Sequence, residues 1–293
     1  MIRVGPAGWS YPDWEGRVWS RSKPKGFHAL PFLARFITCM EVNSSFYALP
    51  QAQHTSRWGS YLEPWPDFRL IMKLHRSFTH ETWDSGKAAE SAIRFSEALA
   101  PLKRRKLLGG ILVQFPVTFL QGPQSLQRLG HISALFEGEN LVLEVRHNSW
   151  FEPPALNSIA GLGFSLAHID LPAAWNHPPE RHAPTGPTGY LRLHGRNSHH
   201  WFNSKSGRDQ RYDYLYSPPE IGQAAYKVDT IAKESDDTYV VTNNHFEGKA
   251  MANALELRYL LEGREPVAAP GPLVSTYPHL QQITRVEGQT ELF

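Results

Sequence analysis

The sequence predicts a single α/β domain with the (β/α)8 arrangement of a TIM-like barrel, followed by a flexible C-terminal tail. Eight short apolar runs recur along the chain, and most segments between them carry apolar residues at helical spacing. The length of 293 residues also suits one large barrel domain. The same alternation of strands and helices also allows an open doubly wound sheet, which is the alternative.

The eight runs are rich in Val, Ile, Leu or aromatic residues and end in polar or turn-forming residues, as buried parallel strands do. The predicted strands are Ile2–Trp9, Thr38–Asn43, Phe68–His75, Leu108–Phe115, Asn140–His147, Phe164–Leu171, Gly189–Gly195 and Thr238–Asn244. Helices are predicted over Phe27–Phe36, Gln51–Leu62, Ser85–Lys106, Pro123–Phe136, Pro219–Glu234 and Glu247–Leu261. After the fifth and sixth strands, a series of prolines from Pro153 to Pro187 leaves little room for long helices.

The barrel is expected to occupy residues 1–262, and residues 263–293 are expected to form a linker and a tail. Glu265–Pro272 is rich in Pro and Ala, which is typical of a linker. Gln281–Phe293 is polar with an apolar end, so we expect it to be poorly ordered.

Composition restricts the class of protein. Lys and Arg number 30 against 28 Asp and Glu, a net charge of +2, which argues against a wholly basic nucleic-acid coat protein but permits a local basic site. The single cysteine, Cys39, excludes an internal disulfide and a Cys-rich zinc site. No secretory leader and no apolar stretch of membrane-spanning length are visible, so we expect a cytoplasmic protein without membrane partners.

Side-chain alternation selects the candidate site. In the third strand Leu70 and Met72 fall on one face, and Lys73 and His75 fall on the other. The apolar set is expected to face the helices, and the polar set to face the interior near the carboxyl ends of the strands, where barrel active sites lie. Applied to the second to the eighth strands, this rule selects Asn43, Lys73, His75, Gln114, Glu144, Arg146, Asp170, Arg192 and His194, and Asn243 and Asn244 are added as the polar end of the eighth strand. Deeper in the interior, Glu41 is expected to pair with Arg192 or Lys73, and His168 to be a hydrogen-bonded core residue.

The selected residues predict a pocket for an anion. Arg and Lys side chains that converge on one point favour phosphate or carboxylate. Glu144 and Asp170 are candidates for base and acid, with His194 as a proton partner. The residues expected to be catalytic are Glu144, Asp170, His194 and Lys73. Those expected to bind substrate are Asn43, Tyr47, His75, His80, Gln114, Arg146, Trp150, Arg192, Asn243 and Asn244.

No cofactor is predicted, because the sequence contains no dinucleotide fingerprint and no P-loop. A divalent metal remains an alternative. His75, Glu144, Asp170 and His194 are acceptable metal ligands, although neighbouring cationic side chains would repel a dication. No metal site is assigned.

Seven ordered motifs give the chain a family resemblance. They are Gly8–Tyr11 with Asp13–Gly16, Glu41–Tyr47, Lys73 with Thr79-His80, Gln114–Pro116, Glu144–Arg146 with Ser149-Trp150, Tyr190–Gly195, and Asn243-Asn244. In this order they resemble the YecE-like family, a widespread domain of unknown function with a TIM-barrel-like fold. The resemblance spans about residues 2–262 and implies the barrel fold, but it implies no reaction. Ser45 and Thr242 depart from the usual Thr and Phe of the family.

The chain ends in Gln289-Thr290-Glu291-Leu292-Phe293, which resembles the Q-x-x-L-F peptide of bacterial replication and repair proteins. In such a peptide the Leu and Phe enter an apolar pocket of the sliding clamp and the Gln hydrogen-bonds at its rim. Gln289, Leu292 and Phe293 are therefore the candidate partner-binding residues.

Three functions follow as hypotheses. The first is an enzyme of hydrolase or phosphodiesterase type that acts on an anionic, phosphate-bearing substrate, including nucleic acid in repair or replication. The second is a non-catalytic module that binds a nucleotide or nucleic acid. The third is a carbohydrate-active barrel that uses Glu144 and Asp170 as a carboxylate pair.

Overall fold

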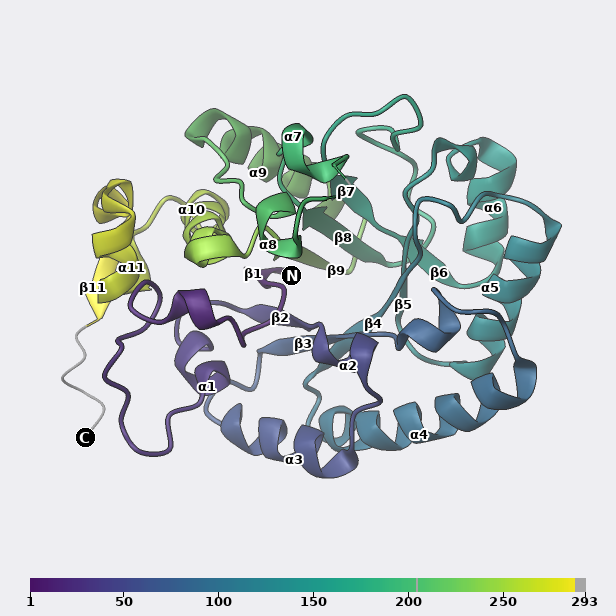
Figure 1. Ribbon diagram of the computed structural model, residues 1–293, viewed down its shortest axis with the longest axis horizontal. Coiled ribbons are helices and arrows are strands. Elements are labelled where there is room, and N and C mark those ends of the chain that lie inside the picture. Colours follow the sequence, from purple (N-terminus) through teal and green to yellow (C-terminus); the bar gives the residue numbers. More distant parts are fainter. Residues whose placement is uncertain (204, 288–293) are drawn as a thin grey trace.

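All eight predicted strands are present in the computed structural model, which describes residues 1–203 and 205–287 (Figure 1). The sixth predicted strand is divided at Ala167 into two short strands. The strands are β1 (Ile2–Pro6), β2 (Cys39–Val42), β3 (Arg69–Lys73), β4 (Leu108–Gln114), β5 (Leu141–Glu144), β6 (Phe164–Leu166), β7 (His168–Asp170), β8 (Thr188–Leu193) and β9 (Asp237–Thr242).

The strands form two parallel sheets, ordered β2-β3-β4-β5-β6 and β1-β9-β8-β7. The sheets adjoin at β1 and β2, where the backbone N–H of Gly8 donates to the carbonyl of Glu41 at 2.8 Å. They adjoin again around Ala167, because β6 pairs with β5 whereas β7 pairs with β8. The predicted α/β class is therefore confirmed, but the backbone hydrogen bonds of the described strands do not form one closed ladder.

Helices cover the outside of the sheets (Figure 1). Each of the six predicted helices is present. The helices up to α10 are α1 (Ala29–Leu33), α2 (Ser44–Tyr47), α3 (Ala52–Tyr61), α4 (Ser85–Arg104), α5 (Pro123–Leu135), α6 (Pro153–Gly161), α7 (Ser198–Trp201), α8 (Arg208–Arg211), α9 (Pro218–Ala232) and α10 (Lys249–Leu261). Short 3₁₀ turns are η1 (Pro12–Trp14), η2 (Arg76–Phe78), η3 (Asn148–Trp150), η4 (Phe246–Gly248) and η5 (Pro278–Gln282).

The two proline-rich crossovers behave differently. After β5 the chain forms the nine-residue helix α6, whose prolines occupy its first turn, where the missing N–H has no helical partner in any case. After β7, residues 171–187 contain no helix. The outer face of β7 is consequently left without the helix that a regular crossover would place there.

The expectation of an irregular linker and tail is wrong for residues 267–287. They form β10 (Val267–Pro270), α11 (Gly271–Thr276), η5 and β11 (Thr284–Glu287), and β10 pairs with β11 in parallel. Val267, Leu273 and Leu280 are buried against the main core, so the segment folds because it carries its own apolar contacts. Gln289, Leu292 and Phe293 lie outside the described residues.

The core has two layers, as side-chain alternation predicts. Met72 and Leu143 belong to a large cluster between the sheets and the helices. Ile71 and Val142, on the opposite strand faces, belong to a small inner cluster that also contains Cys39. The inner face is therefore apolar at depth, and polar side chains take over toward the carboxyl ends of the strands.

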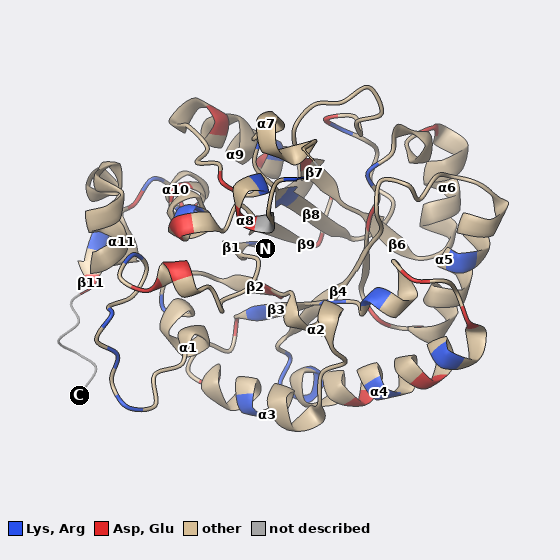
Figure 2. Ribbon diagram, in the orientation of Figure 1, with Lys and Arg blue, Asp and Glu red and all other residues tan. Residues whose placement is uncertain are grey.

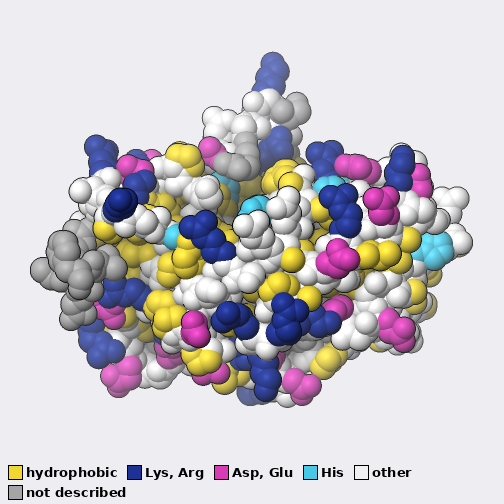
Figure 3. Space-filling model, turned by 90° about the horizontal axis from the view of Figure 1, so that it is seen from below, with side chains coloured by type: hydrophobic (Ala, Val, Ile, Leu, Met, Phe, Trp, Pro, Cys, Tyr) yellow, Lys and Arg dark blue, Asp and Glu magenta, His cyan; other side chains and the backbone are white. Residues whose placement is uncertain are grey.

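Charges of both signs are mixed on the outer surface that Figures 2 and 3 show. Lys, Arg, Asp and Glu are spread over the outer helices in Figure 2, and both signs are interspersed on the face in Figure 3. Within the described part of the chain, no helix has the length and apolar character needed to cross a membrane.

A substitution at Gly5 tests how closely the two sheets approach at β1 and β2. A Cβ atom at Gly5 would overlap the carbonyl oxygen of Cys39, so Gly5→Ala should lower the free energy of unfolding by about 3 kcal/mol through overpacking. Gly222→Ala is the matched control in helix α9, where a Cβ meets open space, and it should raise stability by about 0.5–1 kcal/mol. Urea unfolding measures both. An unchanged midpoint for Gly5→Ala would mean that β1 and β2 do not approach as described.

Candidate functional site

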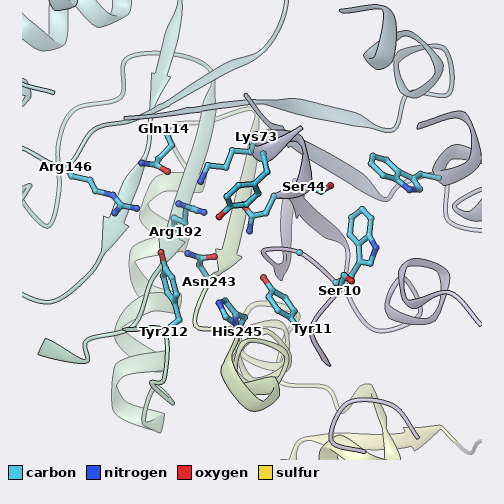
Figure 4. Close-up of a pocket in the computed structure, with 15 residues that line it drawn as sticks. Ser10, Tyr11, Ser44, Lys73, Gln114, Arg146, Arg192, Tyr212, Asn243 and His245 are labelled. Atoms are coloured by element: carbon cyan, nitrogen blue, oxygen red, sulfur yellow. The ribbon is translucent and has the colours of Figure 1, made fainter. Parts of the chain in front are cut away.

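A pocket of ≈ 400 Å³ lies at the carboxyl ends of the strands, within the usual size range of small-molecule sites. Figure 4 shows its side chains converging from the strand ends and from the loops that follow them. The lining residues are Gly8, Trp9, Ser10, Tyr11, Asn43, Ser44, Tyr47, Trp58, Lys73, Gln114, Arg146, Arg192, Tyr212, Asn243 and His245.

The lining is cationic. Lys73 comes from the end of β3, Arg146 follows β5 and Arg192 lies on β8, and all three point into the same space (Figure 4). In the described part of the chain, no Asp or Glu side chain lines this pocket. The carboxylates that balance these cations lie underneath, at Glu41 and Glu144, which are fully buried.

Arg192 joins the two buried carboxylates. Its Nε and Nη2 donate to the two oxygens of Glu41 at 2.9 and 2.6 Å, and its Nη1 donates to Glu144 at 2.8 Å. The hydroxyl of Tyr190 donates to Glu41 at 2.9 Å. A paired and hydrogen-bonded guanidinium is the form in which charge is tolerated in a protein interior. The expectation that Glu41 pairs with Arg192 or Lys73 is met through Arg192.

Glu144 is held as an ionised partner of two arginines. Besides Arg192, it accepts two hydrogen bonds from Arg146, at 2.9 and 2.8 Å. Burial alone would raise the pKa of Glu144, but Arg192 and Arg146 hold it well below its ordinary value. A carboxylate in this state is a weak base at neutral pH, so the geometry favours a charge-balancing role for Glu144.

His194 lies behind the pocket wall and is fully buried. The side-chain amide nitrogen of Asn243 donates to its Nδ1 at 3.1 Å, which leaves the ring proton on Nε2, 3.4 Å from a Glu144 oxygen. Burial lowers the pKa of His194 to about 3, so the ring is neutral at neutral pH. Its position suits orientation of Glu144 rather than contact with a ligand.

Lys73 is the cation of the pocket that lacks a partner of opposite charge. Among the described residues, no carboxylate lies within 4.0 Å of its Nζ and no hydrogen bond is formed. The Nζ instead lies 4.3 Å from the ring centroid of Phe46. Burial, together with the nearby Arg192, lowers the pKa of Lys73 to about 7. The protonated and the neutral amine are therefore both present near neutral pH.

Aromatic side chains form the opposite wall. Trp9 and Trp58 meet edge to face with their ring centroids 5.3 Å apart. Tyr11 stacks on His245 at 4.3 Å, and Tyr212 lies 5.2 Å from His245. Such a wall can receive the flat face of a ring or the apolar body of a ligand.

The structure brings half of the predicted barrel residues to the pocket. These are Asn43, Tyr47, Lys73, Gln114, Arg146, Arg192 and Asn243. Glu144 and His194 support them from behind. Asp170, His75, His80, Trp150 and Asn244 do not line the pocket.

Asp170 lies on the outer face of the sheet, where the alternation rule placed it inside. It pairs with Arg196 at 2.6 Å and accepts from the Tyr216 hydroxyl at 2.8 Å. Ala167 and Ile169 take the inner face instead. The rule assumes that helices cover the apolar face, but no helix follows β7, so polar side chains there face a separate cleft of ≈ 1120 Å³.

The other four residues have local structural roles. His75 accepts from the backbone N–H of Ser77 and so caps the N-terminus of η2. Trp150 is fully buried, with its Nε1 donating to the Phe119 carbonyl at 2.7 Å.

His80 and Asn244 complete this group. The ring of His80 meets Phe46 edge to face at 4.9 Å. Asn244 faces outward and donates to Asn253 of α10 at 2.8 Å, because it follows Asn243 and so takes the opposite face.

Eight lining residues were not selected from the sequence, and three of them, Gly8, Trp9 and Tyr11, belong to a family motif that was given no role in the site. Ser10 lies in the loop after β1 and Ser44 begins the short helix α2, so strand alternation reaches neither, and Trp58 lies on helix α3. His245 directly follows the Asn243-Asn244 pair, so an extension of the strand-end rule by one residue would have found it. Tyr212 follows α8, far along the chain from any strand end, and no sequence signal marks it.

The proposed metal ligands do not gather. Within residues 1–203 and 205–287, no group of three or more His, Cys, Asp or Glu could hold a metal ion. Glu144 and His194 adjoin, but Asp170 lines the separate outer cleft.

The buried ion pair predicts a stability difference. Glu41→Gln should lower the free energy of unfolding by about 3 kcal/mol, because Arg192 loses one of its two buried carboxylates. Glu15→Gln breaks the exposed pair with Lys23 and should cost less than about 1 kcal/mol. Urea unfolding of both variants measures the contrast. Equal small losses would show that Glu41 contributes no more than a surface charge.

Comparison with known proteins places the chain in a family. Residues 3–275 match the family described as "Protein of unknown function DUF72". UPF0759 protein YunF of Bacillus subtilis (strain 168) is 25% identical over 289 residues, which cover 93% of this chain and 99% of that protein. UPF0759 protein YecE of Escherichia coli (strain K12) is 32% identical over 152 residues, which cover 52% of this chain and 50% of that protein.

Solved structures agree with this placement. A DUF72 family protein from Thermotoga maritima MSB8 is similar with a TM-score of 0.78 and 29% identity, covering 89% of this chain and 99% of the other. The structure of SacUVDE is similar with a TM-score of 0.54 and 10% identity, covering 89% of this chain and 99% of the other, a likeness that concerns the fold alone. The match over residues 3–275 shows that the chain belongs to the DUF72 family, to which UPF0759 proteins such as YecE are related, as the sequence motifs predict.

Proposed function

We propose that the pocket is an active site for an anionic ligand that carries a phosphate group. The observation that carries this proposal is the composition of the lining, which has three cationic side chains and, in the described part of the chain, no acidic one. Cationic groups in a partly enclosed site attract anions more strongly than they would in open water. The proposal also treats the two adjoining sheets as the halves of one TIM-like barrel, whose active sites lie at this end of the strands.

Arg146 and Lys73 are the groups that meet the anion. Arg146 uses Nε and Nη2 on Glu144, so its Nη1 is left to bind an oxygen of the ligand. Arg192 is already paired with Glu41 and Glu144, so it attracts the ligand through its positive charge rather than through hydrogen bonds. The amides of Asn43, Gln114 and Asn243 orient the ligand, and the aromatic wall receives its less polar part.

Lys73 is the group that reacts. Two buried carboxylates balance the two arginines, so the proton on Lys73 gives the cluster its surplus positive charge. Release of that proton leaves a neutral amine in contact with the ligand, which is a base and a nucleophile at neutral pH. Formation of a product from a phosphate-bearing substrate distinguishes this enzyme from a module that only binds the same ligand.

The carbohydrate alternative requires two carboxyl groups across one cleft. Glu144 lies beneath the pocket under two arginines, whereas Asp170 lines the outer cleft and pairs with Arg196. The arrangement therefore supplies no such pair, and the anion-binding function is preferred.

Anion affinity should depend on pH through Lys73. Sulfate keeps its charge between pH 6 and 8, while an amine with a pKa of about 7 is mostly protonated at pH 6 and mostly neutral at pH 8. Sulfate should therefore bind about tenfold more tightly at pH 6 than at pH 8. Isothermal titration calorimetry measures the affinities.

Three variants control this titration. Lys73→Arg should retain binding and lose the pH dependence, because a guanidinium stays charged throughout. Arg146→Ala should weaken binding at every pH, and Arg104→Ala, at the exposed end of α4, should change nothing. Equal affinity at pH 6 and 8 in the wild type would remove Lys73 from the anion site.

The C-terminal peptide supports a second proposal, that the chain docks on a sliding clamp and so acts on or near nucleic acid. The last described residue is Glu287, which is exposed and pairs with Arg35 at 2.6 Å, and the peptide begins two residues later in the sequence. A short segment that places Leu and Phe in an apolar pocket is a recurring docking mode.

The docking proposal predicts that Leu292→Ala combined with Phe293→Ala abolishes binding to the purified clamp, because both apolar anchors are lost. Surface plasmon resonance measures the binding, and Thr290→Ala, between the anchor positions, is the matched control. Equal affinity of the double variant and the wild type would end the proposal and leave the pocket as the whole basis for a function.

A further inference from the structure

Lys73 differs from the other cations around it in its surroundings. Arg146 and Arg192 each donate to a buried carboxylate, and the more distant Lys249 pairs with Asp213. Only 9% of the surface of Lys73 is exposed, yet among the described residues its Nζ has no hydrogen bond or ion pair and packs against the ring of Phe46. A buried lysine in a structural role is normally paired, because an unpaired buried charge is costly.

The groups that face Lys73 across the pocket suit a carbonyl compound. The Nη1 of Arg146 forms no hydrogen bond with the described residues and can bind a phosphate or carboxylate of the ligand. The side-chain amide of Asn43 forms no hydrogen bond with the described residues, so it is free to donate to a carbonyl oxygen. A nucleophilic amine, an anion-binding guanidinium and an oxygen-binding amide therefore line one cavity of ≈ 400 Å³.

We propose that Lys73 forms a Schiff base with an aldehyde or ketone that also carries a phosphate or carboxylate group. The proposal rests on the anion-binding function stated above and names its substrate class. The anion of the substrate binds at Arg146, and the carbonyl carbon then meets the lysine nitrogen.

The step is balanced without any co-reactant. The lone pair of the neutral amine attacks the carbonyl carbon, a C–N bond forms, and the electrons of the C=O π bond move to oxygen. The proton that nitrogen loses is equivalent to the one that oxygen gains, which gives a carbinolamine. Loss of its hydroxyl with a second amine proton releases water and leaves the C=N bond.

Burial prepares the amine for this reaction. An ordinary lysine, with a pKa of about 10.4, is almost entirely protonated at neutral pH and has no lone pair to offer. The pocket lowers the pKa of Lys73 to about 7, so a large fraction is neutral without a separate base. Glu144 is not needed for proton removal, which agrees with its two bonds from Arg146 and one from Arg192.

The test is reductive trapping of the full-length protein with pyridoxal 5′-phosphate, an anionic aldehyde, and sodium borohydride. Peptide mass spectrometry locates the adducts. At pH 7 and a limiting amount of aldehyde, Lys73 should be labelled at least about tenfold more than Lys87, whose side chain is 85% exposed. Sulfate should protect Lys73, and Arg146→Ala should reduce its labelling, without effect on Lys87.

Two further controls separate this reaction from nonspecific labelling. Lys73→Arg keeps the charge but removes the nucleophile, so the selective adduct should disappear while the circular dichroism spectrum stays unchanged. Pyridoxal without its phosphate should label Lys73 less. Similar labelling of Lys73 and Lys87, or labelling that is indifferent to both sulfate and Arg146→Ala, would overturn the proposal.

A second trapping experiment, with DNA, shows whether the carbonyl group belongs to nucleic acid or to a small molecule. An oligonucleotide with one abasic site presents an aldehyde between two phosphodiesters. A borohydride-dependent crosslink of this DNA to Lys73 assigns the site to nucleic acid, whereas trapping of pyridoxal phosphate alone assigns it to a small molecule. If neither is trapped at Lys73 while sulfate still binds, the Schiff base is wrong and the anion site stands. If sulfate does not bind, both the Schiff base and the anion-binding function are wrong.

Discussion

The double pairing of Arg192 with Glu41 and Glu144 is the interaction on which the site depends. Glu41 lies on β2 and Glu144 on β5, in one sheet, whereas Arg192 lies on β8 in the other. The guanidinium therefore bridges two sheets that their backbone ladders do not fully join. It also pairs with the two buried carboxylates, which leaves the pocket above it with a net positive charge.

This arrangement separates charge balance from ligand contact. The carboxylates lie at the bottom, where they are fully buried, and the side chains with spare hydrogen-bonding capacity lie above them. Among the described residues no carboxylate pairs with Lys73, and burial first, then the two arginines nearby, disfavour its proton. The low pKa of Lys73 thus depends on burial and, to a smaller extent, on how the charges below it are paired, so a change in that pairing also alters the state of the amine.

Much of the fold and about half of the site follow from sequence patterns. Alternation placed Lys73, Gln114 and Arg192 correctly because those strands have helices outside, as the rule requires. It misplaced Asp170 because the crossover after β7 has no helix, which a single sequence does not reveal. Tyr212 could not be predicted, since the loop that carries it reaches the pocket only through tertiary packing. Residues 267–287 were misjudged because Pro and Ala also suit a short strand and a helix start.

The pocket has a floor of strand residues, Glu41, Glu144 and Arg192, and a rim of residues outside the strands, and the two parts differ in how they tolerate substitution. A single substitution at Glu41, Glu144 or Arg192 leaves a buried charge without its partner. These three residues can therefore be replaced only together. Tyr47 and Tyr212 come from α2 and from the segment after α8, where exchange leaves the floor intact. Substitutions in the rim therefore change the residues that contact a ligand without leaving a buried charge of the floor unpaired.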